Sequence, residues 1–192
     1  MTQAPNPKRR NELSHQAILN ATIALLEEEG YAHMSIEAIA RRAGVSKKTI
    51  YRWWASKAEV VMEAYAAYTA REILIPDTGA VQTDLERLFA QLFTVLTTTP
   101  AGTAMAGIMS EAQSDRQLAQ NFFNNFIANR QAIVLEILER GVERGELRSD
   151  CDLQCVIDML YGTMWYRLML KHRPLTAAFA KTLIQQVITG IE

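Results

Sequence analysis

Apolar residues recur at intervals of three and four along most of this chain, which is the spacing of one face of an α-helix. The first such run places Ile18 and Leu25 on the same side, and Gly30 follows where a helix can end. Glycine and proline fall between the runs, and alternating β-branched stretches are absent. The pattern predicts an all-α protein whose first helix spans about residues 8–29.

Two short helices are expected after the first one, with Gly44 in the turn between them. Ser35 and Ser46 stand where the two helices begin, and serine is a favoured N-cap because its hydroxyl accepts from a free backbone N–H. Glycine permits the sharp exit that a tight turn between helices requires. We therefore expect a second helix from Ile36 and a third helix over residues 47–54.

The remaining pattern predicts a helical body behind this head. A fourth helix begins after Ser56, continues toward Ile75 and bridges the two parts. One uninterrupted helix is expected between Ser114 and Gly141. Further helices are expected to open near Thr83, Pro100, Ser149 and Thr176. The predicted domains are a three-helix head over residues 8–57 and a body over residues 58–192.

Charge changes this picture only when it is divided along the chain. The 192 residues carry a formal net charge of −1, and 49% are hydrophobic, as in ordinary globular proteins. Residues 1–60, however, hold nine Lys or Arg against six Asp or Glu. Six basic residues and no acidic one lie between Arg41 and Lys57. Such a run is either a solvated face or a surface for nucleic acid, so its placement on helices decides between the two.

Two short helices joined by a glycine-containing turn, with basic residues on the second, are the parts of a DNA-binding helix-turn-helix. A helix fits the major groove, and Lys and Arg neutralise the phosphates that dominate affinity. If Ile50 and Trp54 face inward, the other side of the third helix faces the groove. Arg9 and Arg10 either reach the minor groove or form a solvated tail. The residues expected to contact double-stranded DNA are Ser35, Ser46, Lys47, Lys48, Thr49, Tyr51, Arg52, Trp53 and Lys57.

Four segments of the head resemble the signature of TetR/AcrR-type transcriptional regulators: residues 35–40 (SIEAIA), 43–46 (AGVS), 49–51 (TIY) and 56–57 (SK). The resemblance is close over residues 14–60. Two C-terminal segments, residues 144–147 (RGEL) and 166–168 (YRL), resemble a pattern seen in part of the family. The resemblance implies a homodimer on a two-fold operator, usually a repressor, whose C-terminal helices form a ligand pocket and the dimer interface. Lys48 and Trp53 depart from the residues common at their positions in that family.

The body is rich in aromatic and methionine side chains, which form a core or line a cavity for an apolar or aromatic small molecule. The cavity interpretation depends on the family analogy. Glu111, Gln113 and Tyr161 are candidate polar anchors for such a ligand. Arg167 is expected to form a buried ion pair with a carboxylate such as Asp158. The candidate ligand-binding residues are Tyr65, Phe89, Phe93, Met105, Met109, Phe122, Phe126 and Trp165.

Other classes of function find little support in the sequence. No H-E-x-x-H, G-x-S-x-G or glycine-rich phosphate motif occurs, so we expect no catalytic site, metal or cofactor. No apolar run approaches the length of a membrane span and no secretory signal is predicted, so a cytoplasmic protein is expected. The alternatives to a ligand-responsive repressor are a DNA-binding regulator without an effector and a helical module whose basic head binds an acidic protein. An enzyme is the weakest alternative.

Overall fold

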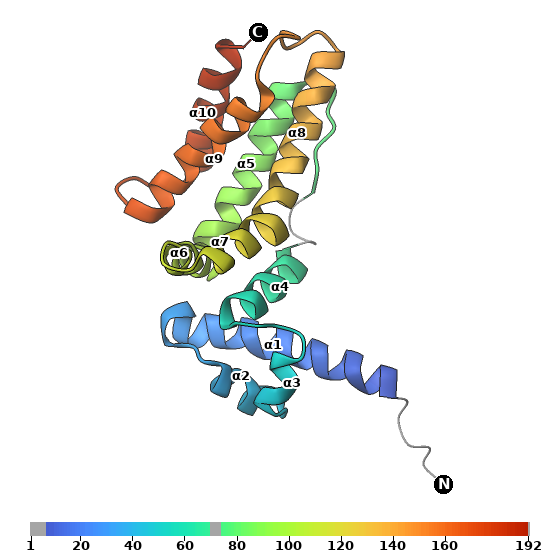
Figure 1. Ribbon diagram of the computed structural model, residues 1–192. Coiled ribbons are helices and arrows are strands. Elements are labelled where there is room, and N and C mark those ends of the chain that lie inside the picture. The colour runs from blue at the N-terminus through green and yellow to red at the C-terminus, as the bar shows by residue number, and fades with distance from the viewer. Residues whose placement is uncertain (1–6, 70–73, 192) are drawn as a thin grey trace. The chain divides into compact units, whose positions relative to one another are not determined.

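The computed structural model describes residues 7–69 and 74–191, and of these the side chains of residues 7–10 and 69 are left out. Arg9 and Arg10 therefore lie outside the described side chains, and the choice between a minor-groove contact and a solvated tail stays open. All regular structure in the described ranges is helical, which confirms the predicted fold class (Figure 1). The helices are α1 (Pro7–His33), α2 (Ile36–Ala43), α3 (Lys47–Tyr51), α4 (Lys57–Thr69), α5 (Val81–Thr98), α6 (Ala101–Ala112), α7 (Arg116–Phe122), the π-helical turn η1 (Phe123–Ile127), α8 (Ala128–Glu143), α9 (Leu153–Leu170) and α10 (Ala177–Thr189).

The chain divides into two compact units. Unit 1 combines Met1–Tyr68 with Thr103–Phe122, and unit 2 combines Thr69–Gly102 with Phe123–Glu192. Helix α7 and nearly all of α6 thus belong with the N-terminal helices, although about thirty residues of sequence separate them from α4. The functional boundary expected after residue 57 stays a prediction, because these units are defined by packing.

Unit 1 is built around the apolar face of α1. Ile18 on α1, Ile39 on α2 and Ile50 on α3 are completely buried, so the three helices share one core. The helical conformation of α1 is interrupted at Gly30, whose φ of 71° and ψ of 166° are not helical. The sequence places a helix end at this same position. Gly44 adopts the left-handed conformation with φ 65° and ends α2, as the turn between α2 and α3 requires.

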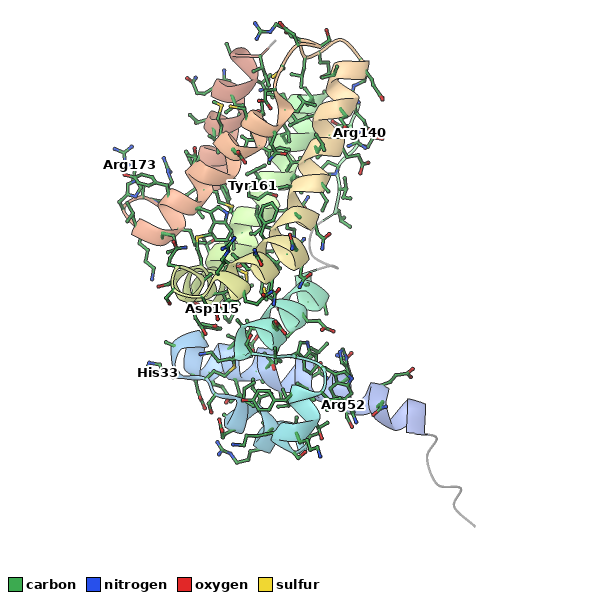
Figure 2. All side chains as sticks on the ribbon, in the orientation of Figure 1. His33, Arg52, Asp115, Arg140, Tyr161 and Arg173 are labelled. Carbon is green, nitrogen blue, oxygen red and sulfur yellow. The ribbon has the colours of Figure 1, made fainter. Side chains whose placement is uncertain are left out.

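Unit 2 consists of α5, η1, α8, α9 and α10. Its core contains Phe89, Phe93 and Tyr161, of which Tyr161 is labelled in Figure 2. The Phe89 ring lies 5.9 Å from that of Phe93 and 5.6 Å from that of Tyr161. The RGEL segment (residues 144–147) caps α5, although it lies far from that helix in the sequence: Val81 N–H at the start of α5 donates to Glu146 Oε2 at 2.8 Å. The segment can turn back in this way because Gly145 has φ 74°.

Three expectations are wrong in detail. The helix expected from Ser114 to Gly141 is interrupted by the π-helical turn η1. Its first part, α7, begins one residue later than expected, because the N-cap is Asp115 rather than Ser114: Asp115 Oδ1 accepts from Leu118 N–H at 3.0 Å. Leu74 and Ile75 are not helical, so α4 does not continue to Ile75. Helix α3 ends at Tyr51 and is shorter than the predicted 47–54.

Arg167 does not pair with Asp158. Its Nη1 donates to the Pro174 carbonyl at 3.0 Å, and its guanidinium lies over the Phe179 ring at 3.2 Å. Burial lowers the pKa of this guanidinium, and the nearby Arg173 adds to the effect. Residues nine apart on an α-helix stand on opposite sides, since each residue adds about 100°. The predicted pair was therefore incompatible with a single helix.

Among the described residues, no single helix has the length and apolar character to cross a membrane; only α5 and α6 taken together across their break have such a composition.

Candidate nucleic-acid interface

The two sides of α3 differ as the sequence predicts. Ile50 is completely buried and Trp54 is 4% exposed, whereas Tyr51 is 54% exposed and Arg52 is also exposed. The apolar side chains thus anchor the helix to unit 1 and leave the polar, cationic side in solvent. This orientation is confirmed; the contacts with DNA that it permits stay predictions.

Serine hydroxyls fix where α2 and α3 begin. Ser35 Oγ accepts from Ala38 N–H at 3.2 Å, and Ser46 Oγ accepts from Thr49 N–H at 3.2 Å. Each hydroxyl satisfies one of the backbone donors that a helix start leaves free. Ser56 and Glu59 act together at the start of α4, where Ser56 Oγ accepts from Glu59 N–H and Glu59 Oε2 accepts from Ala55 N–H.

Carboxylates of the same unit hold two cations of this surface. Lys47 Nζ lies 2.7 Å from Glu37 Oε1, and Arg42 makes a two-pronged contact with Glu28 at 2.5 and 2.6 Å. The hydrogen bonds from Lys47 and Arg42 lower the pKa of the Glu37 and Glu28 carboxyls. In return the pKa of each cation is raised. All four side chains are in contact with solvent, so these pairs are open to exchange.

Neutral groups hold two other cations. Arg52 Nη2 donates to Asn11 Oδ1 at 2.8 Å, and the guanidinium lies 4.4 Å from the centre of the Trp53 ring. Lys57 Nζ donates to the Tyr31 carbonyl at 3.0 Å and lies 4.1 Å from the centre of the Tyr31 ring. A neutral partner restrains a cation without cancelling its charge.

The turn after α3 contains an aromatic cluster that the sequence did not predict. His15 from α1 stacks on Trp54 at 4.9 Å and meets Trp53 edge-on at 5.4 Å. Glu63 from α4 accepts from Trp54 Nε1 at 2.7 Å and lies 2.9 Å from His15 Nε2. The cluster joins α1, the end of α3 and α4. No sequence signal relates these positions, because they come together only when the three helices pack.

The predicted DNA-contacting residues all lie in unit 1. Ser35 begins α2, Ser46 to Trp53 form α3 and its two ends, and Lys57 begins α4. Sequence reasoning missed the partners of the cations, namely Asn11, Glu28, Glu37 and Tyr31. Figure 2 marks Arg52 at the end of α3 beside α1.

Helices α6 and α7 contact the N-terminal helices within unit 1. Tyr31 Oη donates to Glu111 Oε2 at 2.5 Å, and a Cβ at Gly107 would come within 2.5 Å of the Tyr31 ring. Asn121 Nδ2 donates to Glu59 Oε1 at 2.7 Å. Burial, followed by the hydrogen bond to Glu111, raises the pKa of Tyr31 above its usual range. Glu111, a candidate ligand anchor, thus accepts a hydrogen bond from a residue of the head.

The candidate ligand-binding residues divide between the units. Tyr65, Met105, Met109 and Phe122 belong to unit 1, and Phe89, Phe93, Phe126 and Trp165 belong to unit 2. Met109 and Trp165 are half-buried and the others are buried. Of the other two candidate anchors, Tyr161 donates from its hydroxyl to the Arg130 carbonyl at 3.1 Å, and Gln113 donates from Nε2 to the Met109 carbonyl at 3.1 Å. Their role in ligand binding stays a prediction.

Two family models match the chain. Residues 18–64 match "Bacterial regulatory proteins, tetR family", and residues 75–187 match "Tetracyclin repressor-like, C-terminal domain". The chain is 32% identical over 190 residues to the uncharacterized HTH-type transcriptional regulator YdeS of Bacillus subtilis (strain 168), covering 99% of this chain and 96% of that protein.

Solved structures share the fold. The TetR family transcription regulator SCO0332 matches with a TM-score of 0.82 and 33% identity over 93% of this chain and 98% of the other. FadR from Bacillus subtilis, solved in complex with stearoyl-CoA, matches with a TM-score of 0.70 over 93% of this chain and all of the other, at 20% identity. The second likeness concerns the fold alone.

Proposed function

The chain belongs to the TetR family of bacterial regulatory proteins, and from this premise we propose that it is a ligand-responsive repressor that acts as a homodimer on a two-fold operator. Members of this family are DNA-binding transcriptional regulators rather than enzymes, so the activity of this chain is the control of transcription through DNA. Because that activity is exercised on the chromosome, we place the protein in the bacterial cytoplasm.

One observation carries the mode of DNA binding: Ile50 of α3 and Trp54 just after it are buried, whereas Lys47, Lys48 and Arg52 are exposed. A helix anchored in this way presents its polar side to the major groove while its N-terminal amides favour a phosphate. Lys47, Lys48 and Arg52 then meet base edges or phosphates, and the remaining predicted contacts fix the position of the head.

The test begins with genome-wide capture of bound DNA, which identifies an operator. We expect the double variant Lys47→Ala, Arg52→Ala to lose preference for that operator over random duplex, because base contacts of this kind each discriminate by about 1–3 kcal/mol. The slope of log affinity against log salt should become shallower by about 0.9 for each phosphate contact removed. Arg87→Ala, Lys181→Ala removes two exposed cations of unit 2 and serves as the matched control. Parent-like binding by the first variant would refute the assignment of α3.

The exposed face of α9 supports the homodimer. Met159, Tyr166 and Leu170 are 50%, 58% and 60% exposed, and they recur on one side of the helix with Gly162 among them. A Cβ built at Gly162 meets no atom within 4 Å, so this face is open. An apolar stripe with a glycine suits close helix packing, and a two-fold dimer presents two heads to a two-fold operator.

A small apolar or aromatic effector is the second part of the proposal. The aromatic and methionine residues of the body supply the lining that such a ligand prefers, and the FadR fold neighbour binds stearoyl-CoA. A regulator without an effector is the alternative. Thermal-shift screening of acyl-CoA thioesters and aromatic compounds separates the two, followed by operator titration with each compound that binds. An effector that binds tightly and leaves operator affinity unchanged would contradict ligand responsiveness.

We place the coupling between effector binding and operator affinity at the contacts that α6 and α7 make with the head. The Tyr31–Glu111 hydrogen bond joins α6 to the end of α1, and the same Tyr31 holds Lys57 at the start of α4. Tyr31→Phe keeps the ring and removes only the bond to Glu111. We expect this variant to bind the operator as the parent does and to release it less in response to effector. An unchanged response would exclude this route.

A further inference from the structure

Arg52 is held by a neutral partner, whereas the cations Lys47 and Arg42 are held by carboxylates. Glu37 and Glu28 cancel the charge of Lys47 and Arg42, whereas Asn11 holds Arg52 through a neutral amide oxygen. Arg52 therefore keeps its full positive charge for a phosphate or a guanine edge. Because it is exposed at the end of α3, it is accessible to a duplex.

The two partners of Arg52 leave most of its donors available. A guanidinium has five N–H donors, and the bond to Asn11 uses one of those on Nη2. The contact with the Trp53 ring engages the face of the guanidinium and uses no donor. The planar group is thus held by one edge and one face, and among the residues that the structure describes its other N–H groups have no partner.

The partners are themselves fixed by unit 1. Trp53 meets the edge of His15 at 5.4 Å and of Trp54 at 5.5 Å, and Trp54 is buried. His15 belongs to α1, as does Asn11 one helical turn earlier. Both restraints on Arg52 are consequently tied to the same helix, which does not itself form part of the helix-turn-helix.

We propose that Asn11 and Trp53 are positioning residues that pre-order Arg52 for specific DNA binding. An arginine that is already ordered loses less side-chain entropy when it binds. In this role Trp53 acts through Arg52, in addition to the direct DNA contact that the sequence predicts for it. The inference rests on the proposed contact of Arg52 with DNA.

The closing experiment compares operator and random-duplex affinity for four variants: Arg52→Ala, Asn11→Ala, the double variant, and Gln16→Ala. Gln16 is the matched control, an exposed amide on α1 that bonds to Asn20. We expect Asn11→Ala to weaken operator binding by about two- to twelvefold, the cost of ordering one long side chain, and Gln16→Ala to have no effect. The loss should vanish when Arg52 is already alanine.

The outcomes distinguish the positioning role of Asn11 from the proposed contact of Arg52 with DNA. If Arg52→Ala binds as the parent does, both fail. If Arg52→Ala is weak and Asn11→Ala binds as well as the parent or better, only the positioning role is overturned. An equal Asn11→Ala loss in the Arg52→Ala background also overturns it, because Asn11 would then act on DNA by itself. A second readout is ¹⁵N relaxation at Arg52 Nε in DNA-free protein, which should report greater mobility in Asn11→Ala; unchanged mobility would contradict pre-ordering.

Discussion

At the scale of single residues, the cations on and beside the proposed DNA-contacting surface differ in the partner that DNA would have to displace. A phosphate that binds Lys47 competes with Glu37, and one that binds Arg42 competes with Glu28. The pKa of each carboxyl is lowered from 4.5, so both ion pairs are intact at neutral pH. They weaken only as the pH falls through these lowered pKa values, below 4.5, where the carboxyls take up protons. DNA binding near pH 7 therefore meets this competition in full.

Removing a competing carboxylate should strengthen non-specific binding. We expect Glu37→Gln to raise affinity for random duplex more than for the operator, because Lys47 then contacts phosphate with no pair to break. On random duplex we expect Lys47 of the parent to stay paired with Glu37, so there the salt slope of the variant should steepen by about 0.9 for the one added phosphate contact. Both effects are measured by fluorescence anisotropy over a salt series. In a Lys47→Ala background they should disappear, and their persistence there would show that Glu37 acts by general repulsion of the duplex.

At the scale of elements, short segments of this chain depend on caps rather than on length. Helix α3 has only five residues, which is too short to be stable in isolation, and Ser46 satisfies a backbone donor at its start. Helix α5 has no side-chain cap at Ala80 and obtains one from Glu146, more than sixty residues away. Leu147 beside it is buried, so the RGEL pattern is a structural device of unit 2.

Loss of this distant cap should destabilise unit 2. We expect Glu146→Ala to lower the free energy of unfolding by about 1–3 kcal/mol, since the Val81 N–H loses its acceptor in a partly buried site. Urea unfolding followed by circular dichroism measures the change. Glu146→Gln retains a carbonyl acceptor and should lose less, and Glu143→Ala, on an exposed residue of α8, should be nearly neutral. Equal stability of Glu146→Ala and Glu143→Ala would remove the capping role.

At the scale of the whole molecule, the proposed function requires two copies of the chain, each with both of its units. The chain enters unit 1 again at Thr103 and leaves it after Phe122, where the π-helical turn η1 begins. Helices that are distant in sequence from the head therefore share its packing, and a change in them acts on α1 and α4 directly. The exposed stripe of α9 lies in unit 2, which would leave unit 1 to the operator.

A charge on the α9 stripe should separate the proposed dimer. In a two-fold interface Met159→Glu introduces the carboxylate twice, and an unpaired charge buried at an interface costs about 3–5 kcal/mol. We expect sedimentation velocity to show monomer at concentrations where the parent is a dimer, with weaker operator binding as a consequence. Thr94→Glu places the same charge on an exposed site of α5 and should remain dimeric. A dimeric Met159→Glu variant would move the interface elsewhere.

The sequence by itself determined the helical fold, the helix-turn-helix and the buried side of α3, because helical periodicity, serine caps and Gly44 are local signals. It could not locate η1 or the end of α4, which local pattern specifies weakly. Only the tertiary structure decided that Asn11 holds Arg52, that Glu146 caps α5 and that α6 joins the head at Tyr31. These contacts join residues 41, 65 and 80 positions apart, and such pairings depend on how whole helices pack.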